Sequence, residues 1–233
     1  MDAVLLAAGL GTRLRPHTLH TPKPLLPVRG RPILDWTLGA LPGPVERVLV
    51  VVHYLADKVE QYLAGQKHFT QWQTVFQEQP RGTGDALRQC RPFLRSDRFL
   101  VLNGDDLFGA ADLARLAECS AGVLCHPVNE PRKFGIAITR DDGTLERLWE
   151  KPDLDGTRLA NTGAYVFPQA VFNLEIGLSP RGEYEITDYV NGLAIERPVQ
   201  VVTCDFWLPI GTEDAWNNAQ KMDLEKHLTR EKA

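Results

Sequence analysis

The sequence predicts an α/β fold in which helices flank a mixed, mostly parallel sheet. Two observations support this prediction. Short apolar, β-branched runs alternate with longer helical patterns through the first half of the chain, which is typical of βαβ units. In the second half, several strand-like runs follow one another. A chain of 233 residues can bury one sizeable core, so we expect a single domain spanning residues 1–233.

The first half is expected to supply the parallel strands and the helices that cover them. Strands are predicted at Ala3–Ala8, Arg47–Val52, Gln73–Gln77 and Arg98–Leu102. Helices are predicted at Ile33–Leu41, Ala56–Leu63, Thr83–Cys90 and Ala111–Glu118. Such parallel strands are covered on both faces, which explains their near-continuous apolar runs.

The second half is expected to form an α+β subregion built on the same sheet. Strands are predicted at Gly122–Pro127, Gly135–Thr139, Leu145–Glu150 and Asn161–Val166. The residues Arg140–Gly143 ("RDDG") predict a turn between two of them. A final amphipathic helix is predicted over Thr212–Arg230, with Thr212 as its N-cap and acidic residues in its first turn.

Composition and charge exclude several classes of protein. The net charge of −4 argues against a general nucleic-acid binder, which would be basic. The four cysteines are far apart and form no CxxC pair, so neither a zinc site nor a disulfide framework is expected. No secretory leader pattern and no apolar run of about 20 residues is present, so we expect a cytoplasmic protein without a membrane partner.

A glycine-rich turn, "GLGTRL" (Gly9–Leu14), follows the first predicted strand. Leu14 stands where a dinucleotide-binding fingerprint has its third glycine, and no GK[ST] sequence completes a Walker A loop. What remains is a flexible turn at the carboxyl end of a strand, where open α/β sheets bind ligands. Its N–H groups can face an anion, and Arg13 adds a planar group that is always charged.

The lysine of "TPKPLLPV" stands on a stiff segment. Pro24 biases Lys23 towards an extended backbone, and Pro22 has its own φ fixed by its ring. A lysine that must be held near a phosphate benefits from such rigidity.

Together, the stretch "LAAGLGTRLRPHTLHTPKPLLPV" resembles the signature of the sugar-1-phosphate nucleotidyltransferases, also called NDP-sugar pyrophosphorylases. The typical pattern of this family is a Gly-x-Gly-Thr-Arg loop followed by Pro-Lys-Pro-Leu. Further matches follow in the expected order: "FQEQPRGTGDAL", "VLNGDD", "KFGIA", "WEKP", "ANTGAYVF", "GEYEITD" and "FWLPIGTEDAW". The resemblance runs from Met1 to about Trp216 and is to the short form, without a C-terminal β-helix domain.

The resemblance implies a Rossmann-like, GT-A-like nucleotidyltransferase fold and a transfer reaction. An oxygen of a sugar 1-phosphate would attack the α-phosphorus of an NTP and expel pyrophosphate. Residues of about 1–120 would mainly bind the nucleotide, those of about 121–215 the sugar, and 212–230 would form the C-terminal helix. UTP or dTTP and glucose 1-phosphate are the favoured substrates, and the NTP and the sugar phosphate are the expected partners.

The resemblance also implies roles for single residues on the nucleotide side. Arg13 would hold the β- and γ-phosphates, Lys23 would contact phosphate at the reacting centre, and Asp105 would bind Mg²⁺, the expected cofactor. Asp106 would point elsewhere in an extended chain and ranks second. The nucleotide-binding set is Leu6, Ala8, Gly9, Gly11, Thr12, Arg13, Gln77, Gly82 and Thr83.

On the sugar side, the family pattern implies a second set. Glu150 would bind sugar hydroxyls and Lys151 the sugar phosphate. The whole sugar-phosphate set is Lys23, Gly135, Glu150, Lys151, Asn161, Thr162 and Glu183.

One position departs from the family. A W-x-D-x-G-T motif commonly supplies a second acidic metal ligand, but this chain has Pro209 in its place. Either Asp105 and the substrate phosphates suffice, or Asp205 substitutes from a shifted position.

Two alternatives therefore stay open beside the favoured function. The chain could be a cytidylyltransferase that acts on phosphocholine or another small phosphate, although a quaternary amine favours an aromatic cage. It could also be a non-catalytic regulatory subunit that binds nucleotide sugars. Whether the chain forms a homo-oligomer is left open by its sequence.

Overall fold

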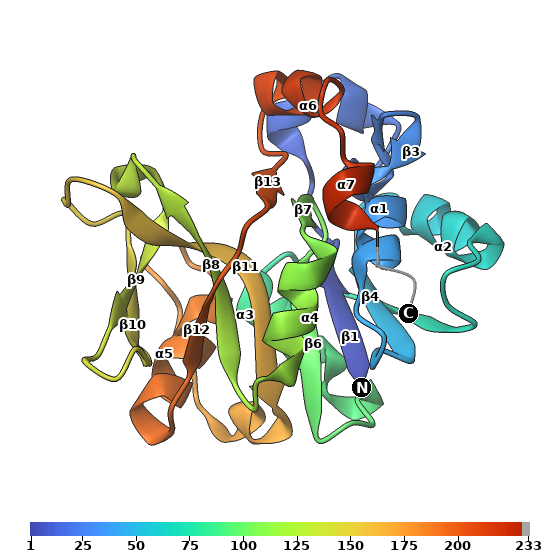
Figure 1. Ribbon diagram of the computed structural model, residues 1–233. Coiled ribbons are helices and arrows are strands. Elements are labelled where there is room, and N and C mark those ends of the chain that lie inside the picture. Colours follow the sequence, from blue (N-terminus) through green and yellow to red (C-terminus); the bar gives the residue numbers. More distant parts are fainter. Residues whose placement is uncertain (230–233) are drawn as a thin grey trace.

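The computed structural model describes residues 1–229, and its main sheet has nine strands (Figure 1). Four strands from the first half run parallel, in the order β6-β1-β4-β5. Their bounds are Arg98–Asn103 (β6), Asp2–Leu6 (β1), Arg47–Val52 (β4) and Gln71–Phe76 (β5). The βαβ pattern of the sequence therefore predicted this half of the sheet correctly.

The second half continues the same sheet with mainly antiparallel pairs. Strand β11 (Arg158–Pro168) lies antiparallel to β6 and also pairs with β8 and β9. Strand β12 is parallel to β8, and β10 is antiparallel to β9. The remaining bounds are Gly122–Val128 (β8), Gly135–Thr139 (β9), Leu145–Glu150 (β10) and Gln200–Thr203 (β12). The predicted mixed sheet is confirmed, and β11 is the strand that joins its two halves.

Two hydrophobic clusters cover the two faces of the sheet, because alternate side chains of a strand point to opposite faces. In β1, Ala3 and Leu5 belong to one cluster and Val4 to the other. The first cluster includes residues of α1 (Ile33–Ala40), α2 (Ala56–Gly65) and α4 (Ala110–Glu118). The second includes residues of α3 (Thr83–Cys90) and α5 (Ile186–Glu196).

Several elements were not predicted. Helix α5 was missed, as were the short strands β2 (Pro27–Val28), β3 (Arg31–Pro32), β7 (Asp106–Phe108), β12 and β13 (Trp207–Pro209). The two-stranded pairs β2·β3 and β7·β13 are too short to show a period of two in the sequence.

The single C-terminal helix predicted over Thr212–Arg230 is wrong. The chain forms α6 (Glu213–Ala219) and α7 (Glu225–Leu228) instead, and Arg230 lies outside the described residues. Tertiary contacts occur where α6 ends: the Gln220 side chain accepts a hydrogen bond from Arg29 N and donates one to Pro27 O. The predicted N-cap is confirmed, since Thr212 Oγ1 accepts from Ala215 N at 3.2 Å.

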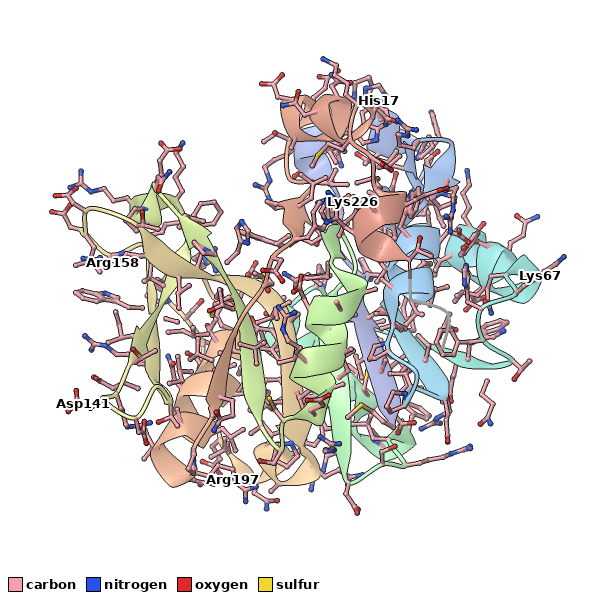
Figure 2. All side chains as sticks on the ribbon, in the orientation of Figure 1. His17, Lys67, Asp141, Arg158, Arg197 and Lys226 are labelled. Carbon is pink, nitrogen blue, oxygen red and sulfur yellow. The ribbon has the colours of Figure 1, made fainter. Side chains whose placement is uncertain are left out.

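Segments from the two ends of the chain lie side by side at the top of the molecule (Figure 1). Figure 2 labels His17 there, beside α6. Its Nε2 lies 3.5 Å from Glu213 Oε1, and its ring is 4.7 Å from that of Trp216. Among residues 1–229, no helix is long and apolar enough to cross a membrane.

Candidate functional site

A pocket of about 470 Å³ opens at the carboxyl ends of the parallel strands. Three segments of the first half line most of it: the turn after β1, the turn between β5 and α3, and the end of β6. The lining residues are Leu6, Ala7, Ala8, Gly9, Leu10, Gly11, Thr12, Arg13, Leu14, Lys23, Pro24, Gln77, Pro80, Gly82, Thr83, Ala86, Asn103, Asp105, Glu183 and Gly211. All nine predicted nucleotide-binding residues are among them, with Lys23, Asp105 and Glu183.

The strand order explains why the pocket lies at this point. After β1 the chain adds β4 and β5 on one side of it and then returns to add β6 on the other. The connections on the two sides of β1 therefore diverge, which leaves a crevice beyond its carboxyl end. The glycine-rich turn enters this crevice directly from β1.

Gly11 allows the turn to approach the rest of the site closely. Its φ is +61°, and a Cβ there would lie 2.9 Å from Thr18 Cγ2 and 3.2 Å from Lys23 Cβ. Thr18 Oγ1 also donates to Gly11 O at 2.8 Å, which fixes the turn against the segment that carries Lys23. At Gly9, by contrast, a Cβ would meet no described atom, so the missing side chain leaves free space in the pocket.

Arg13 stands at the rim of the pocket with an exposed side chain. Within residues 1–229 its guanidinium makes no ion pair and no hydrogen bond. A Cβ on Gly211 would lie 3.6 Å from Arg13 Nη1, so the segment before α6 closes one side of the arginine. An unpaired guanidinium beside a backbone turn favours a bound anion.

Lys23 and Asp105 meet inside the pocket. Lys23 Nζ donates to Asp105 Oδ2 at 2.5 Å, and the side chains are 8% and 39% exposed, respectively. The lysine begins a 3₁₀ turn, Lys23–Leu25, so the extended backbone predicted for Lys23 is wrong, and it is Pro22 that is extended. The turn is closed by hydrogen bonds from Leu25 N to Pro22 O and from Leu26 N to Lys23 O. The carboxylate follows the end of β6, with its oxygen towards the lysine.

Asp106, the neighbour of Asp105, is buried and does not line the pocket. Its Oδ2 accepts a hydrogen bond from Trp207 Nε1 at 3.2 Å, and its backbone pairs with Pro209 in the β7·β13 pair. Burial raises the pKa of Asp106 well above the ordinary value, and the neighbouring Asp105 carboxylate raises it further. Asp106 is therefore a buried carboxyl that is bonded to Trp207 and lies close enough to Lys23 and Asp105 for their charges to act on it.

The turn between β5 and α3 is fixed by a loop from the second half of the chain. Tyr184 N donates to Arg81 O, and Gly84 N donates to Tyr184 O, both at 2.8 Å. Gly82 has a φ of +101°, and a Cβ there would lie 2.5 Å from Tyr184 O, so only glycine fits this contact. The same loop brings Glu183 to the pocket.

Thr83 has a structural contact that the sequence did not reveal. Its Oγ1 accepts a hydrogen bond from Ile186 N at 3.0 Å, at the start of α5. The residue lines the pocket, but its hydroxyl is engaged with this helix.

Five predicted sugar-side residues do not line this pocket: Gly135, Glu150, Lys151, Asn161 and Thr162. Gly135 on β9 pairs with Glu150 at the end of β10, and Lys151 follows directly after this strand. A Cβ on Gly135 would lie 3.0 Å from Glu150 Oε2 and 4.0 Å from Asn161 Cβ. Thr162 is buried and donates to Leu124 O at 2.8 Å.

Lys151 has an unusual backbone for its residue type. Its φ is +43°, in the left-handed region, and its N–H donates to Phe134 O. Its side chain is 59% exposed and 4.0 Å from the Glu150 carboxylate. Strain of this kind in a non-glycine residue is often found at functional sites.

Asn103 joins the pocket to the sugar-side strand, and it was missed at the level of sequence. It is the last residue of β6 and lines the pocket. Gly163, with a φ of +83°, passes so close to it that a Cβ would overlap the Asn103 amide. The signal was a polar residue that ends the apolar run of "VLNGDD".

Asp205, the second candidate metal ligand, is not brought to the pocket. Its side chain is 85% exposed and lies 3.2 Å from Arg115 Nη2 on α4. In the described part of the chain, no group of three or more His, Cys, Asp or Glu residues could hold a metal ion. Asp105 and Glu183 are the acidic residues that line the pocket, and Asp105 is the one paired with Lys23.

Comparison with known proteins gives matches along almost the whole chain. A family model described as "Nucleotidyl transferase" matches residues 2–226. The bifunctional protein GlmU of Methanocaldococcus jannaschii is 32% identical over 229 residues, which are 97% of this chain and 55% of that protein. The chain thus spans about half the length of this relative. The UTP–glucose-1-phosphate uridylyltransferase AglF of Haloferax volcanii is 31% identical over 242 residues, 99% of both chains.

Solved structures resemble the fold closely. A Bacillus anthracis protein described as a glucose-1-phosphate thymidylyltransferase, in complex with sucrose, superposes with a TM-score of 0.82 at 28% identity. The match covers 95% of this chain and 94% of that one. A UDP-glucose pyrophosphorylase complexed with UDP-glucose gives a TM-score of 0.84 at 20% identity, over 97% and 99% of the two chains. At that identity the second likeness concerns the fold alone.

Proposed function

The chain belongs to the nucleotidyl transferase family, and on this basis we propose that it transfers a nucleotidyl group from an NTP to a sugar 1-phosphate. The products would be an NDP-sugar and pyrophosphate. We favour UTP or dTTP as donor and glucose 1-phosphate as acceptor. The names of AglF and of the Bacillus anthracis protein support this choice, because they are the relatives of nearly equal length.

The pairing of Lys23 with Asp105 inside the pocket is the observation that carries the proposal. A buried lysine and a half-exposed carboxylate, 2.5 Å apart, lie beside a glycine-rich turn and an unpaired arginine. Nucleotidyl transfer needs this combination: cations against phosphate oxygens, and a carboxylate that can accept a metal ion.

The chemistry requires little covalent help from the protein. An oxygen of the sugar 1-phosphate attacks the α-phosphorus, the bond to the β-phosphate breaks, and pyrophosphate leaves with the bonding electrons. Arg13 at the rim would hold the β- and γ-phosphates and stabilise the charge that develops on the leaving group. Lys23 would stabilise the charge on the oxygens of the α-phosphorus, and its burial keeps it in place.

The residues of the pocket fit Mg²⁺ as the cofactor. Mg²⁺ is often bound by one or two carboxylates together with substrate phosphates and water, so Asp105 can hold it without a second acidic residue. When bound, the ion neutralises phosphate charge. Asp105 would hold the ion, and the Lys23 ammonium beside it would contact substrate phosphate. The proline at position 209 is therefore compatible with activity.

The second candidate acceptor, phosphocholine, is decided by the experiment below. The half-buried ring of Trp207 packs against those of His126 and Phe134, with centroids 6.1 and 5.6 Å away. None of these three rings lines the pocket, so they do not select between phosphocholine and a sugar.

The experiment is a panel of five NTPs against glucose 1-phosphate, other hexose 1-phosphates and phosphocholine, with release of pyrophosphate as readout. Each pair is measured with Mg²⁺ and again after its removal by a chelator. Activity with a hexose 1-phosphate that disappears with the chelator is the expected result. Silence across the panel in folded protein would overturn the proposal, and tight binding without turnover would instead indicate a regulatory subunit. Turnover of phosphocholine alone would select the second candidate.

A further inference from the structure

The side chain of Gln77 is held in one orientation at the wall of the pocket. It is 3% exposed, and its Nε2 donates to Gly82 O at 3.1 Å and to Asp85 Oδ2 at 3.0 Å. Both hydrogens of the amide are therefore used within the protein. A rotated amide would place its oxygen against two acceptor oxygens, so the chemistry of the neighbours fixes which end faces inward.

The other end of the amide faces the pocket. No group in residues 1–229 donates a hydrogen bond to Gln77 Oε1. Every fully buried side-chain oxygen and nitrogen of the described chain, however, has a hydrogen-bond partner. Gln77 Oε1 is consequently accessible, and Gln77 lines the pocket. The wall thus presents a hydrogen-bond acceptor.

Asp85 determines this orientation, and it is itself fixed. It lies in the first turn of α3 with a side chain that is 6% exposed, and its second oxygen, Oδ1, accepts from Arg88 Nη2 at 2.8 Å. A carboxylate in this position can only accept hydrogen bonds, so it always selects the NH₂ end of Gln77. Gly82 O alone would favour the same orientation through a single bond.

We propose that Asp85, anchored by Arg88, is a positioning residue that sets the base specificity of the enzyme by holding the Gln77 amide with its oxygen towards the nucleotide. The inference rests on the proposed function for its substrate. An acceptor in the wall suits a base with a ring N–H at its edge, such as uracil or thymine. It opposes cytosine and adenine, whose corresponding ring nitrogens carry lone pairs, so that two acceptors would face each other.

The test measures nucleotide affinity and turnover separately. Equilibrium binding of UTP, CTP and N3-methyl-UTP is measured for the wild type and for Asp85→Asn. The asparagine amide can donate to Gln77 Oε1 and so permits the glutamine amide to rotate. Because buried hydrogen bonds that are lost or opposed cost roughly 10- to 100-fold in binding, we expect the wild type to prefer UTP over CTP by at least that factor.

Asp85→Asn is expected to reduce the preference for UTP over CTP by about 10-fold or more. It should also reduce the loss of affinity that N3-methylation of UTP causes. The contribution of the phosphate groups to nucleotide affinity should stay similar. Arg88→Ala should shift the preference in the same direction but less, and it serves as the second variant if Asp85→Asn does not fold. A role in stability alone would lower the melting temperature and leave the preference unchanged.

The chain contains a matched control pair on α4. Asp112 and Arg115 have the same spacing, with side chains 3% and 45% exposed against 6% and 46% for Asp85 and Arg88. Asp112→Asn and Arg115→Ala should leave the UTP-to-CTP preference unchanged.

The outcomes separate this inference from the proposed function. An unchanged preference in Asp85→Asn and Arg88→Ala overturns the role of Asp85, whatever the turnover. A wild type that binds UTP selectively but never releases pyrophosphate overturns the proposed function. The role of Asp85 is then decided by the ratio of UTP to CTP affinity in the wild type and in the variants. A wild type that binds none of the nucleotides overturns both.

Discussion

Lys23 Nζ lies 2.5 Å from Asp105 Oδ2, although 82 positions separate the two residues in the chain. The contact is created by the fold: a rigid turn after β1 places the lysine, and the end of β6 places the carboxylate. Within this pair each group neutralises the charge of the other. Substrate phosphate and a metal ion would have to replace this pair together, so the pair keeps both groups in position for the reaction.

Replacement of Lys23 should affect the chemical step most. We expect Lys23→Ala to lower kcat by about 10²- to 10³-fold, the usual loss for one group that stabilises transition-state charge. The KM for the NTP should change less. Steady-state kinetics check this, with Lys67→Ala as the control; Figure 2 shows Lys67 at the outer edge of the molecule, beside α2. A Lys23→Ala enzyme with near-normal kcat would refute the role.

Replacement of Arg13 should weaken the binding of the β- and γ-phosphates, which leave as pyrophosphate. Its guanidinium is unpaired within the described chain and lines the pocket, so its removal costs substrate contacts and little stability. We expect Arg13→Ala to raise the KM for the NTP and the inhibition constant of pyrophosphate by about 10- to 100-fold. Arg15→Ala, an exposed neighbour outside the pocket, is the control. Equal effects of the two substitutions would contradict the assignment.

Gly163 should be intolerant of a side chain. Its positive φ costs about 1–3 kcal/mol for other residues, and a Cβ would overlap the Asn103 amide. Gly163→Ala is therefore expected to lower the free energy of unfolding by at least that amount and to displace Asn103 in the pocket. Chemical denaturation measures the loss. Gly43→Ala is the control, because a Cβ there meets no described atom and the backbone is not left-handed.

Acid should destabilise the fold through Asp2. Burial alone would raise the pKa of Asp2, but hydrogen bonds from Arg47 and from two backbone N–H groups, with the charge of Arg47, lower it below 3.8. A lowered pKa stabilises the folded state at every pH above 3.8, and this contribution disappears as the pH falls through the folded-state pKa.

Asp2→Asn tests this directly. It leaves Arg47 buried without its counter-charge, so the free energy of unfolding at neutral pH should fall by about 3–5 kcal/mol. The variant should also lose less of its remaining stability in acid than the wild type does. Asp141→Asn is the control, since Figure 2 shows Asp141 at the outer tip of the β9–β10 turn. Parallel stability curves for Asp2→Asn and wild type against pH would refute the argument.

The gathering of several predicted residues at one pocket follows from the strand order. Gly9–Arg13, Gln77 and Asp105 come shortly after β1, β5 and β6, and the carboxyl ends of parallel strands meet at one edge. Their role in nucleotide binding, which the family resemblance implies, stays a prediction. The pairing of Lys23 with Asp105 could not be predicted, because the spacing of residues along the chain does not give the direction of their side chains.

The residues predicted to bind the sugar were harder to place from the sequence, for a physical reason. Four of them lie on antiparallel strands, where neighbours alternate between faces: Asn161 donates to Tyr165 Oη, whereas Thr162 is buried and donates to Leu124 O. The motif therefore contains buried residues beside accessible ones, and the motif alone does not separate them. Helix α5 and the break before α7 depend on tertiary contacts of Thr83 and Gln220, which leave no local pattern.

The contact of Gly211 with Arg13 has a consequence for synthesis of the protein. Because a chain leaves the ribosome from its N-terminus, the glycine-rich turn emerges first and the segment that closes it emerges near the end. The half-finished chain has the turn and the arginine, but not the wall formed by Gly211. The side of Arg13 that faces Gly211 is therefore closed only after nearly the whole polypeptide has been released.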